Sequence, residues 1–204
     1  MQLVRISEKS TILLIMSKLS SSVFAWFLQL LISALSYGVL FYCNLALASS
    51  LAFGVGVNWI YLPAGLRLFL TLIFDLSGAI GIALASFLIS YYGEFPHDLT
   101  LCIGIGLISG FAPYLARLFV LRNMHLEPDL GDLNIYKLGT CILVYALLSA
   151  GLHQWWFFTM GLDKAGTMNH FAVMVFGDIL GSVLLIAVMK WLMDWLKRIK
   201  QTVR

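Results

Sequence analysis

The sequence predicts an all-α, polytopic helical membrane protein with about six transmembrane or half-membrane helices, and three observations lead to this prediction. Hydrophobic residues make up 61% of the 204 residues. Charged residues make up only 11%, whereas a soluble domain carries about 25%. The mean hydropathy is +0.93. A soluble core of a chain this short cannot bury so much apolar surface, so we expect the chain to lie in a lipid bilayer.

The domain organisation follows from the same pattern, because no polar stretch is long enough to form a second domain. We expect a cytoplasmic N-terminal segment over residues 1–22, one polytopic membrane domain over residues 23–196 and a basic cytoplasmic tail over residues 197–204. The apolar run after the basic N-terminus is too long for the core of a signal peptide, so we expect it to be retained.

The first predicted span covers residues 23–50, which is long enough to cross a bilayer with some tilt. Small residues near its end predict a close contact with another helix. These are Ala46, Ala48, Ser50 and Ala52.

The next apolar stretch is interrupted. Pro63 fits the first turn of a helix that runs to about Phe74, and the Asp-Leu-Ser-Gly sequence at residues 75–78 is typical of a turn. Residues 79–92 then predict a second short helix, and each piece alone is short for a span. Two arrangements remain open: both pieces cross a thin region of the bilayer, or together they form a re-entrant hairpin.

Three more apolar runs complete the chain, over residues 99–121, 136–158 and 168–192. In the first of them, Gly106 and Gly110 have the spacing of a close helix contact. Lys and Arg gather near the N-terminus, between the first two of these runs and in the tail, so the positive-inside rule puts both termini in the cytoplasm. We expect a multi-pass protein of a bacterial inner (plasma) membrane.

Four ionisable side chains fall within the predicted spans or at their ends: Arg67, Asp75, Arg117 and Asp178. Charges are costly in hydrocarbon and normally face a partner in the bundle interior. Depths estimated from the helical rise predict two ion pairs, Arg67 with Asp178 and Arg117 with Asp75. The alternative is that both arginines extend to the membrane interface and that Asp75 lies in a hydrated turn.

Motifs of the common soluble enzymes are absent from the sequence, and no nucleophile is placed beside a base. The three cysteines stand singly in apolar runs, which is typical of small buried residues. His97, His153 and His170 are expected on the outer side, but they lack the helical spacing of a metal site. We therefore expect no catalysis, no metal, no cofactor and no nucleic-acid partner.

Two stretches resemble the MASE1 membrane-sensor family. The sequence W-x-x-L-P-A-G-L at residues 59–66 is similar to its W-x-P-A/S-G-L region, and F-G-D-I-L-G at residues 176–181 is similar to its G-D-x-L-G segment. The resemblance covers residues 40–192 in outline and implies a polytopic sensory domain. The motif residues that it implies are Trp59, Pro63, Gly65, Gly177 and Gly181. Family members have more spans and precede kinase or cyclic-di-GMP output domains, which this sequence lacks.

The predicted function is a non-catalytic, membrane-embedded sensory or ligand-binding module with Arg67 and Asp178 at its polar centre. A small-molecule ligand or a proton would compete for this pair and shift the short helices against the last span. Its partners would be the lipid bilayer and a membrane or signalling protein. The size and helix number also resemble the substrate-binding subunits of vitamin transporters, so the alternative is a substrate-binding subunit of a small-molecule uptake transporter.

Overall fold

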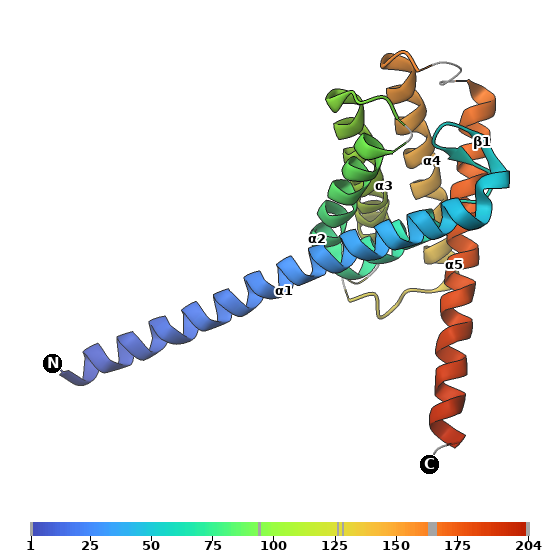
Figure 1. Ribbon diagram of the computed structural model, residues 1–204. Coiled ribbons are helices and arrows are strands. Elements are labelled where there is room, and N and C mark those ends of the chain that lie inside the picture. The colour runs from blue at the N-terminus through green and yellow to red at the C-terminus, as the bar shows by residue number, and fades with distance from the viewer. Residues whose placement is uncertain (1, 94, 126, 128, 163–166, 203–204) are drawn as a thin grey trace.

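Five helices make up most of the computed structural model (Figure 1). They are α1 (Gln2–Ala48), α2 (Leu62–Tyr92), α3 (Leu99–Asn123), α4 (Ile135–Thr159) and α5 (Met168–Thr202). The structure describes residues 2–93, 95–125, 127, 129–162 and 167–202, with residues 2–21, 49 and 200–202 described as backbone only. Each helix contains a stretch long and apolar enough to cross a membrane. The predicted all-α, polytopic fold is confirmed.

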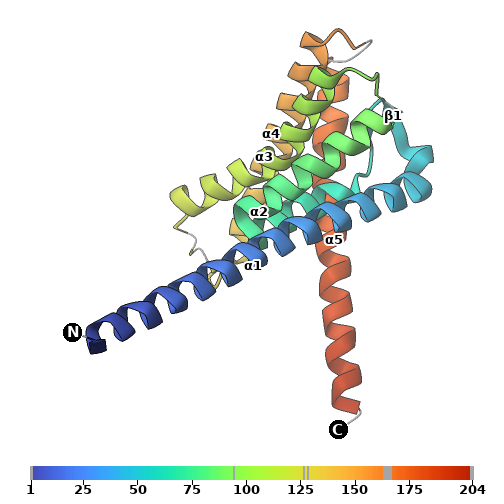
Figure 2. The ribbon, with the colours of Figure 1, turned by 60° about the vertical axis from the view of Figure 1, so that its left-hand side comes forward.

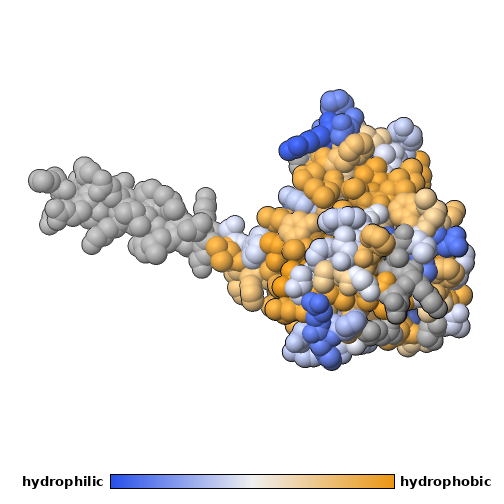
Figure 3. Space-filling model, turned by 90° about the horizontal axis from the view of Figure 1, so that it is seen from above, coloured by the Kyte–Doolittle hydropathy of each residue, from blue (hydrophilic) through white to orange (hydrophobic). Residues whose placement is uncertain are grey.

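The helices α2 to α5 form a bundle, and α1 crosses one side of it obliquely (Figures 1 and 2). The N-terminal part of α1 and the C-terminal part of α5 extend beyond the bundle as single helices. Both helices run without a break through residues 22 and 196, the boundaries predicted for the membrane domain. Seen from the end that carries the α4–α5 loop, the surface is largely hydrophobic, with hydrophilic residues gathered in patches (Figure 3).

The helix α2 folds back on itself at Asp75, whose φ of 54° and ψ of −131° are not helical. A Cβ atom on Gly78 would lie 2.6 Å from the carbonyl oxygen of Leu70, eight residues earlier. A straight helix would separate these residues by about 12 Å. Leu70 and Ile82, from the two halves, therefore belong to one buried apolar cluster. The predicted pair of short helices is confirmed, but the predicted turn over residues 75–78 is confined to Asp75, because residues 76–78 are already helical. This return of the chain is common to both predicted arrangements.

A small β-hairpin between α1 and α2 was not predicted. Its strands β1 (Ala52–Gly54) and β2 (Val57–Asn58) pair antiparallel, after a single 3-10 turn at Ser49–Leu51. Val57 is 1% exposed and packs with Ala150 of α4 and with apolar residues of α5. The hairpin thus covers the bundle where α4 and α5 meet.

Close helix packing follows the small residues. Cβ atoms on Gly106 and Gly110 of α3 would lie 2.7 Å from the carbonyl oxygen of Ala83 and 2.2 Å from that of Ala79. The backbones of α2 and α3 are therefore nearly in contact, as the spacing of these glycines predicts. The close contact predicted for the small residues near the end of α1 is limited to Ala48, because Ala46, Ser50 and Ala52 are exposed.

The connections are held by polar contacts. The Asp98 carboxylate accepts hydrogen bonds from the first turn of α3, and the Asn134 amide oxygen accepts one from the first turn of α4. Lys137 of α4 forms an ion pair with Asp132 of the loop between the two helices. This ammonium group, with the backbone N–H of Glu127, lowers the pKa of the Asp132 carboxyl group from its usual value.

Candidate functional site

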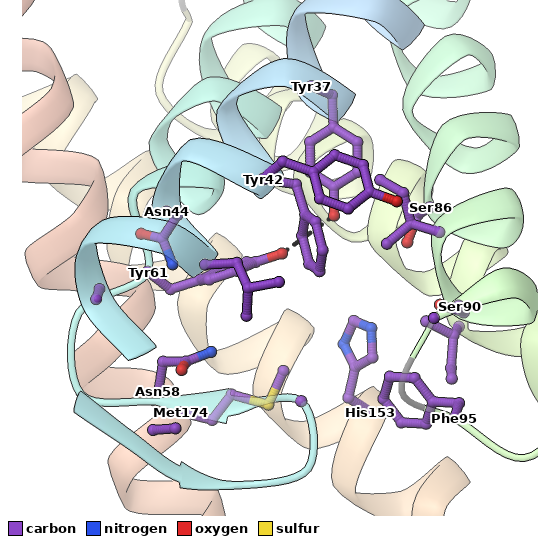
Figure 4. A pocket seen from close by; sticks show the side chains of 18 of the residues that line it. Tyr37, Tyr42, Asn44, Asn58, Tyr61, Ser86, Ser90, Phe95, His153 and Met174 are labelled. Atoms are coloured by element: carbon purple, nitrogen blue, oxygen red, sulfur yellow. Dashed lines mark hydrogen bonds between the residues drawn. The ribbon is translucent and has the colours of Figure 1, made fainter. Parts of the chain in front are cut away.

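A cavity of about 200 Å³ lies between the helices and is lined by residues from α1 to α5 and from the hairpin. Its wall is mainly apolar but includes several polar or charged side chains. They are Tyr37, Tyr42, Asn44, Asn58, Tyr61, Arg67, Ser86, Ser90 and His153. Figure 4 shows Asn44 and Asn58 on one side of the cavity, and Ser86 and Ser90 on the other. Ala52 and Gly56, which also line it, are exposed, so the cavity reaches the surface beside the hairpin.

Arg67 contributes to the cavity wall, although its residue is only 4% exposed. Its Nη2 atom donates to the hydroxyl oxygen of Tyr37 at 2.5 Å and to that of Tyr61 at 3.0 Å. The guanidinium carbon lies 5.0 Å from the centre of each tyrosine ring. The two hydroxyl groups are 3.1 Å apart and share a hydrogen bond (Figure 4). The cation is thus held by both the hydroxyls and the ring faces.

A directed chain of hydrogen bonds joins two residues of the cavity wall, Ser86 and His153, through Ser109. The Ser86 hydroxyl donates to Ser109 Oγ of α3 at 2.8 Å, and Ser109 Oγ lies 3.4 Å from His153 Nε2 of α4. His153 Nδ1 lies 2.8 Å from the carbonyl oxygen of Ser149, which can only accept, so Nδ1 carries a hydrogen. In the neutral ring Nε2 then accepts from Ser109, which ties α2, α3 and α4 together.

His153 is therefore an interior residue of α4, and its expected place on the outer side of the membrane stays a prediction. It is 3% exposed and faces the cavity. A sequence signal for this was present, because Tyr145, Ser149 and His153 recur at every fourth position and so share one face of α4. All three are buried.

Asn44 of α1 joins the cavity to the start of α2. Its side-chain oxygen accepts from the backbone N–H of Leu62 at 3.1 Å, which satisfies one of the unpaired donors at the helix N-terminus. Its amide nitrogen has no hydrogen-bond partner among the described residues. Tyr37, Asn44 and Tyr61 were all missed from the sequence, because a tyrosine or asparagine in an apolar run gives no indication of its partner.

Asp178 of α5 is 1% exposed, but the predicted ion pair with Arg67 is wrong. No oxygen of Asp178 lies within 4.0 Å of a nitrogen of Arg67, and Asp178 does not line the cavity. Its Oδ2 atom has no hydrogen-bond partner in the described part of the chain. The two charges still interact through space, and Tyr145 and Ser149 lie beside the carboxylate. Arg67 instead donates its hydrogen bonds to Tyr37 and Tyr61, whose hydroxyl oxygens lie 2.5 and 3.0 Å from its Nη2 atom.

The predicted pair of Arg117 and Asp75 is confirmed as a contact, with 2.6 Å between Nη1 and Oδ1. The Arg117 side chain is 7% exposed and that of Asp75 is 53% exposed. Neither residue lines the cavity. This pair joins the turn of α2 to α3 rather than forming part of the candidate site.

The two motif stretches pack directly on one another. The backbone N–H of Tyr61 donates to the carbonyl oxygen of Gly177 at 3.2 Å. A Cβ atom on Gly177 would lie 2.1 Å from the carbonyl oxygen of Asn58, and one on Gly181 would lie 1.9 Å from that of Tyr61. A Cβ atom on Gly65 would lie 2.8 Å from the Cα atom of Ser182. These glycines therefore let an extended segment and the start of α2 lie against α5.

The remaining motif residues have different surroundings. Pro63 is buried in the first turn of α2, as predicted, whereas Trp59 is 46% exposed and packs edge-on against Phe53 of the hairpin. Of the cysteines, Cys102 and Cys141 are buried and Cys43 is exposed on α1. Within the described ranges, no group of three or more His, Cys, Asp or Glu side chains is arranged to hold a metal ion.

Comparisons with known proteins add no family to this geometry. No protein-family model matches the chain, and no curated protein or solved structure is similar to it at a significant level. The function is therefore argued from the cavity and its surroundings.

Proposed function

We propose that this protein is a membrane-embedded sensory module that binds a small molecule in the cavity and signals through a partner protein. The observation that carries the proposal is the composition of the cavity wall. Five helices and a hairpin contribute to it, and it includes a buried arginine. Small-molecule sites have this character, with apolar walls and a few placed polar groups.

The cavity adjoins a segment with two distinct halves. Arg67 comes from the first half of α2, whereas Ser86 and Ser90 come from the second half. A bound molecule that contacts both halves stabilises one angle between them over others. Such a ligand shifts the arrangement only by the difference between its affinities for the two states. The turn at Asp75 is the hinge on which this change would act.

The resemblance to MASE1 sensory domains supports the same proposal. The stretches that carry it, residues 59–66 and 176–181, adjoin the cavity through Tyr61 and hold α2 against α5. A change in the position of α2 would thus be passed to α5, which extends beyond the bundle and is available to a partner chain.

The test is to compare the small molecules retained by the full chain with those retained by a cavity-filled variant. Both proteins are purified in mild detergent from membranes of the native cell and analysed by mass spectrometry. Ser90→Leu fills the cavity, because Ser90 is 4% exposed and lines it. Ser36→Leu is the matched control on α1, where Ser36 bonds only to backbone oxygens of its own helix and lies outside the cavity wall.

We expect a small molecule that copurifies with the wild type and the Ser36 variant but not with Ser90→Leu. Equal retention by all three proteins would contradict binding in this cavity. Crosslinked partners identified in the same preparation separate the two functions. A kinase or cyclase supports the sensor, whereas an ATPase module, with ligand accumulation in cells, would replace it by the uptake-transporter subunit.

A further inference from the structure

We infer that the ligand of the cavity is a small organic carboxylate whose anionic group binds at Arg67. This inference rests on the proposed function, because it names the chemical class of the molecule bound there. It follows from the charge, the hydrogen-bond donors and the size of the cavity.

The charge in the cavity wall is positive and has no direct counterion. Arg67 is 4% exposed, and its nitrogens contact no carboxylate within 4.0 Å among the described residues. Neither Asp nor Glu is among the residues that line the cavity. Asp178 lowers the cost of burying Arg67 from a distance, but it accepts none of its hydrogen bonds. A buried cation normally has an anionic partner in contact with it. An anion bound beside Arg67 would therefore compensate the charge of its guanidinium group.

The hydrogen-bond inventory around Arg67 also lacks acceptors. Nη2 uses its two hydrogens on the oxygens of Tyr37 and Tyr61. One tyrosine O–H donates to the other oxygen, so the second O–H has no acceptor among the described residues. Nε is buried without a partner, and no hydrogen bond of Nη1 is found in the described part of the chain, although the Tyr145 hydroxyl group lies beside Arg67. These donors require oxygen lone pairs, which a carboxylate supplies in a geometry that matches the planar guanidinium.

A further donor and the walls determine the rest of the ligand. The amide nitrogen of Asn44, unpaired among the described residues, lines the same cavity. The remaining wall is apolar and partly aromatic, with Phe41, Phe95, Ile105 and Phe157 among its residues. A cavity of about 150 Å³ holds benzene, so the 200 Å³ here fits an acid slightly larger than benzene. Planar or short-chain monoacids and diacids meet these requirements.

The experiment uses matched acids and amides as probes on the full chain in detergent. Benzoate, nicotinate and succinate are each compared with benzamide, nicotinamide and succinamide, at constant ionic strength and with sodium chloride as the inorganic anion. The thermal unfolding midpoint is followed by tryptophan fluorescence, because a ligand of the folded state raises the midpoint as its concentration rises. We expect at least one acid to raise the midpoint while its amide does not.

Arginine variants connect this effect with Arg67. Arg67→Met keeps the apolar stem and removes the donors, and we expect it to weaken binding of the acid at least about tenfold. Arg67→Lys keeps the charge but loses the planar fork, so it should retain part of the affinity. Arg122→Gln removes an exposed arginine at the end of α3 and should leave binding unchanged. If Arg67→Met does not fold, Ser90→Leu replaces it as the variant that should abolish the acid-induced shift.

The outcomes separate this inference from the proposed function. Equal shifts with acids and amides, lost in Ser90→Leu, would overturn the carboxylate and leave a binding cavity. Equal shifts with chloride and the acids would overturn an organic ligand. If none of the acids raises the midpoint, the carboxylate is rejected, whereas the copurified molecule described above still tests whether the cavity binds anything. An acid shift that survives in both Arg67→Met and Ser90→Leu would place binding elsewhere.

Discussion

At the scale of single residues, Arg67 and Asp178 are two buried charges that interact without touching. Removing one of them leaves the other as an uncompensated charge in the interior, which is costly even when the two groups are not in contact. Their hydrogen-bond partners differ, because Arg67 donates to Tyr37 and Tyr61, whereas Ser149 lies beside Asp178. The two residues are therefore coupled by charge rather than by a shared bond.

We predict that Arg67→Met and Asp178→Asn each destabilise the protein by about 1–3 kcal/mol, and that the double variant loses less than the sum. The reason is that the second substitution removes the unpaired charge created by the first. The free energies of unfolding of the wild type, the two single variants and the double variant are measured by chemical denaturation in detergent micelles, and together they form a double-mutant cycle. Strictly additive losses would show that the two charges do not stabilise each other.

Asp75 combines an ion pair with an unusual backbone. Its φ of 54° and ψ of −131° are readily adopted by glycine and strained for other residues. Its carboxylate also forms an ion pair with the largely buried guanidinium group of Arg117. The contact with α3 therefore offsets a backbone conformation that does not suit an aspartate.

Substitutions at Asp75 should separate these two contributions. Asp75→Ala loses the ion pair and keeps the strain, so we expect the unfolding midpoint to fall. Asp75→Gly also loses the pair but relieves strain of about 1–3 kcal/mol, so its midpoint should fall less. Equal midpoints for the alanine and glycine variants would mean that the turn carries no strain.

At the scale of the elements, the position of α2 is determined by its backbone contact with α5. Gly177 and Gly181 leave no space for a side chain, because the carbonyl oxygens of Asn58 and Tyr61 occupy that space. Neither oxygen belongs to a flexible side chain, so the contact cannot adapt locally. This contact brings Tyr61 and Arg67 to the cavity.

Gly181→Ala should therefore destabilise the protein by about 1–3 kcal/mol or more, since it overpacks a backbone contact. Gly139→Ala is the matched control in α4, where a Cβ atom would meet nothing within 4 Å. Alanine is the better helix former, so this control should leave stability unchanged or raise it by up to about 1 kcal/mol. The measurements are membrane expression and the unfolding midpoint in detergent, and equal behaviour of the two variants would contradict the close contact.

The hydrogen-bond chain through His153 is the second connection between elements. We predict that Ser109→Ala lowers the free energy of unfolding by about 1–3 kcal/mol, because it leaves the Ser86 donor and His153 Nε2 without partners. Thr159→Ala, at the exposed end of α4, is the control and should have little effect. Denaturation in detergent measures both, and a neutral Ser109→Ala would show that the chain contributes nothing to stability.

At the scale of the whole molecule, the arrangement of the helices constrains the topology in a membrane. The α3–α4 loop and the C-terminus lie toward one end of the bundle, and the α4–α5 loop lies at the other (Figure 1). The positive-inside rule assigns the first end to the cytoplasm, because Lys and Arg are concentrated there. Since α2 returns on itself, this assignment does not depend on how deeply its turn reaches.

Cysteine labelling tests this topology. In a Cys43→Ser background, which removes the exposed native cysteine, a membrane-impermeant maleimide applied to intact cells should label Thr167→Cys at the α4–α5 loop and should not label His125→Cys in the α3–α4 loop. Both positions are exposed, so accessibility within the protein is matched. In broken cells both variants should react. Labelling of His125→Cys in intact cells would contradict the predicted orientation.

The sequence by itself determined the class of protein, the places of the helices and a break that begins at Asp75. These follow from composition, apolar run length and turn propensity, which are local properties. The pair of Arg117 and Asp75 was also predictable, because both residues lie near ends of adjacent elements and the helical rise estimates their depth well. The glycines at positions 65, 177 and 181 were recognised as motif residues without their contacts.

Only the tertiary structure decided what lies around Arg67. Tyr37 and Asn44 of α1 are distant in the sequence from Arg67 and from His153, and hydroxyl or amide side chains in apolar helices give no signal of their partner. The helical rise estimates the depth of a residue but not its direction around the helix axis. It therefore predicted a contact between Arg67 and Asp178, whereas in the structure Arg67 donates hydrogen bonds to two tyrosines. The cavity arises from the fold-back of α2 and the approach of α1 and the hairpin, and those long-range contacts depend on all the elements together.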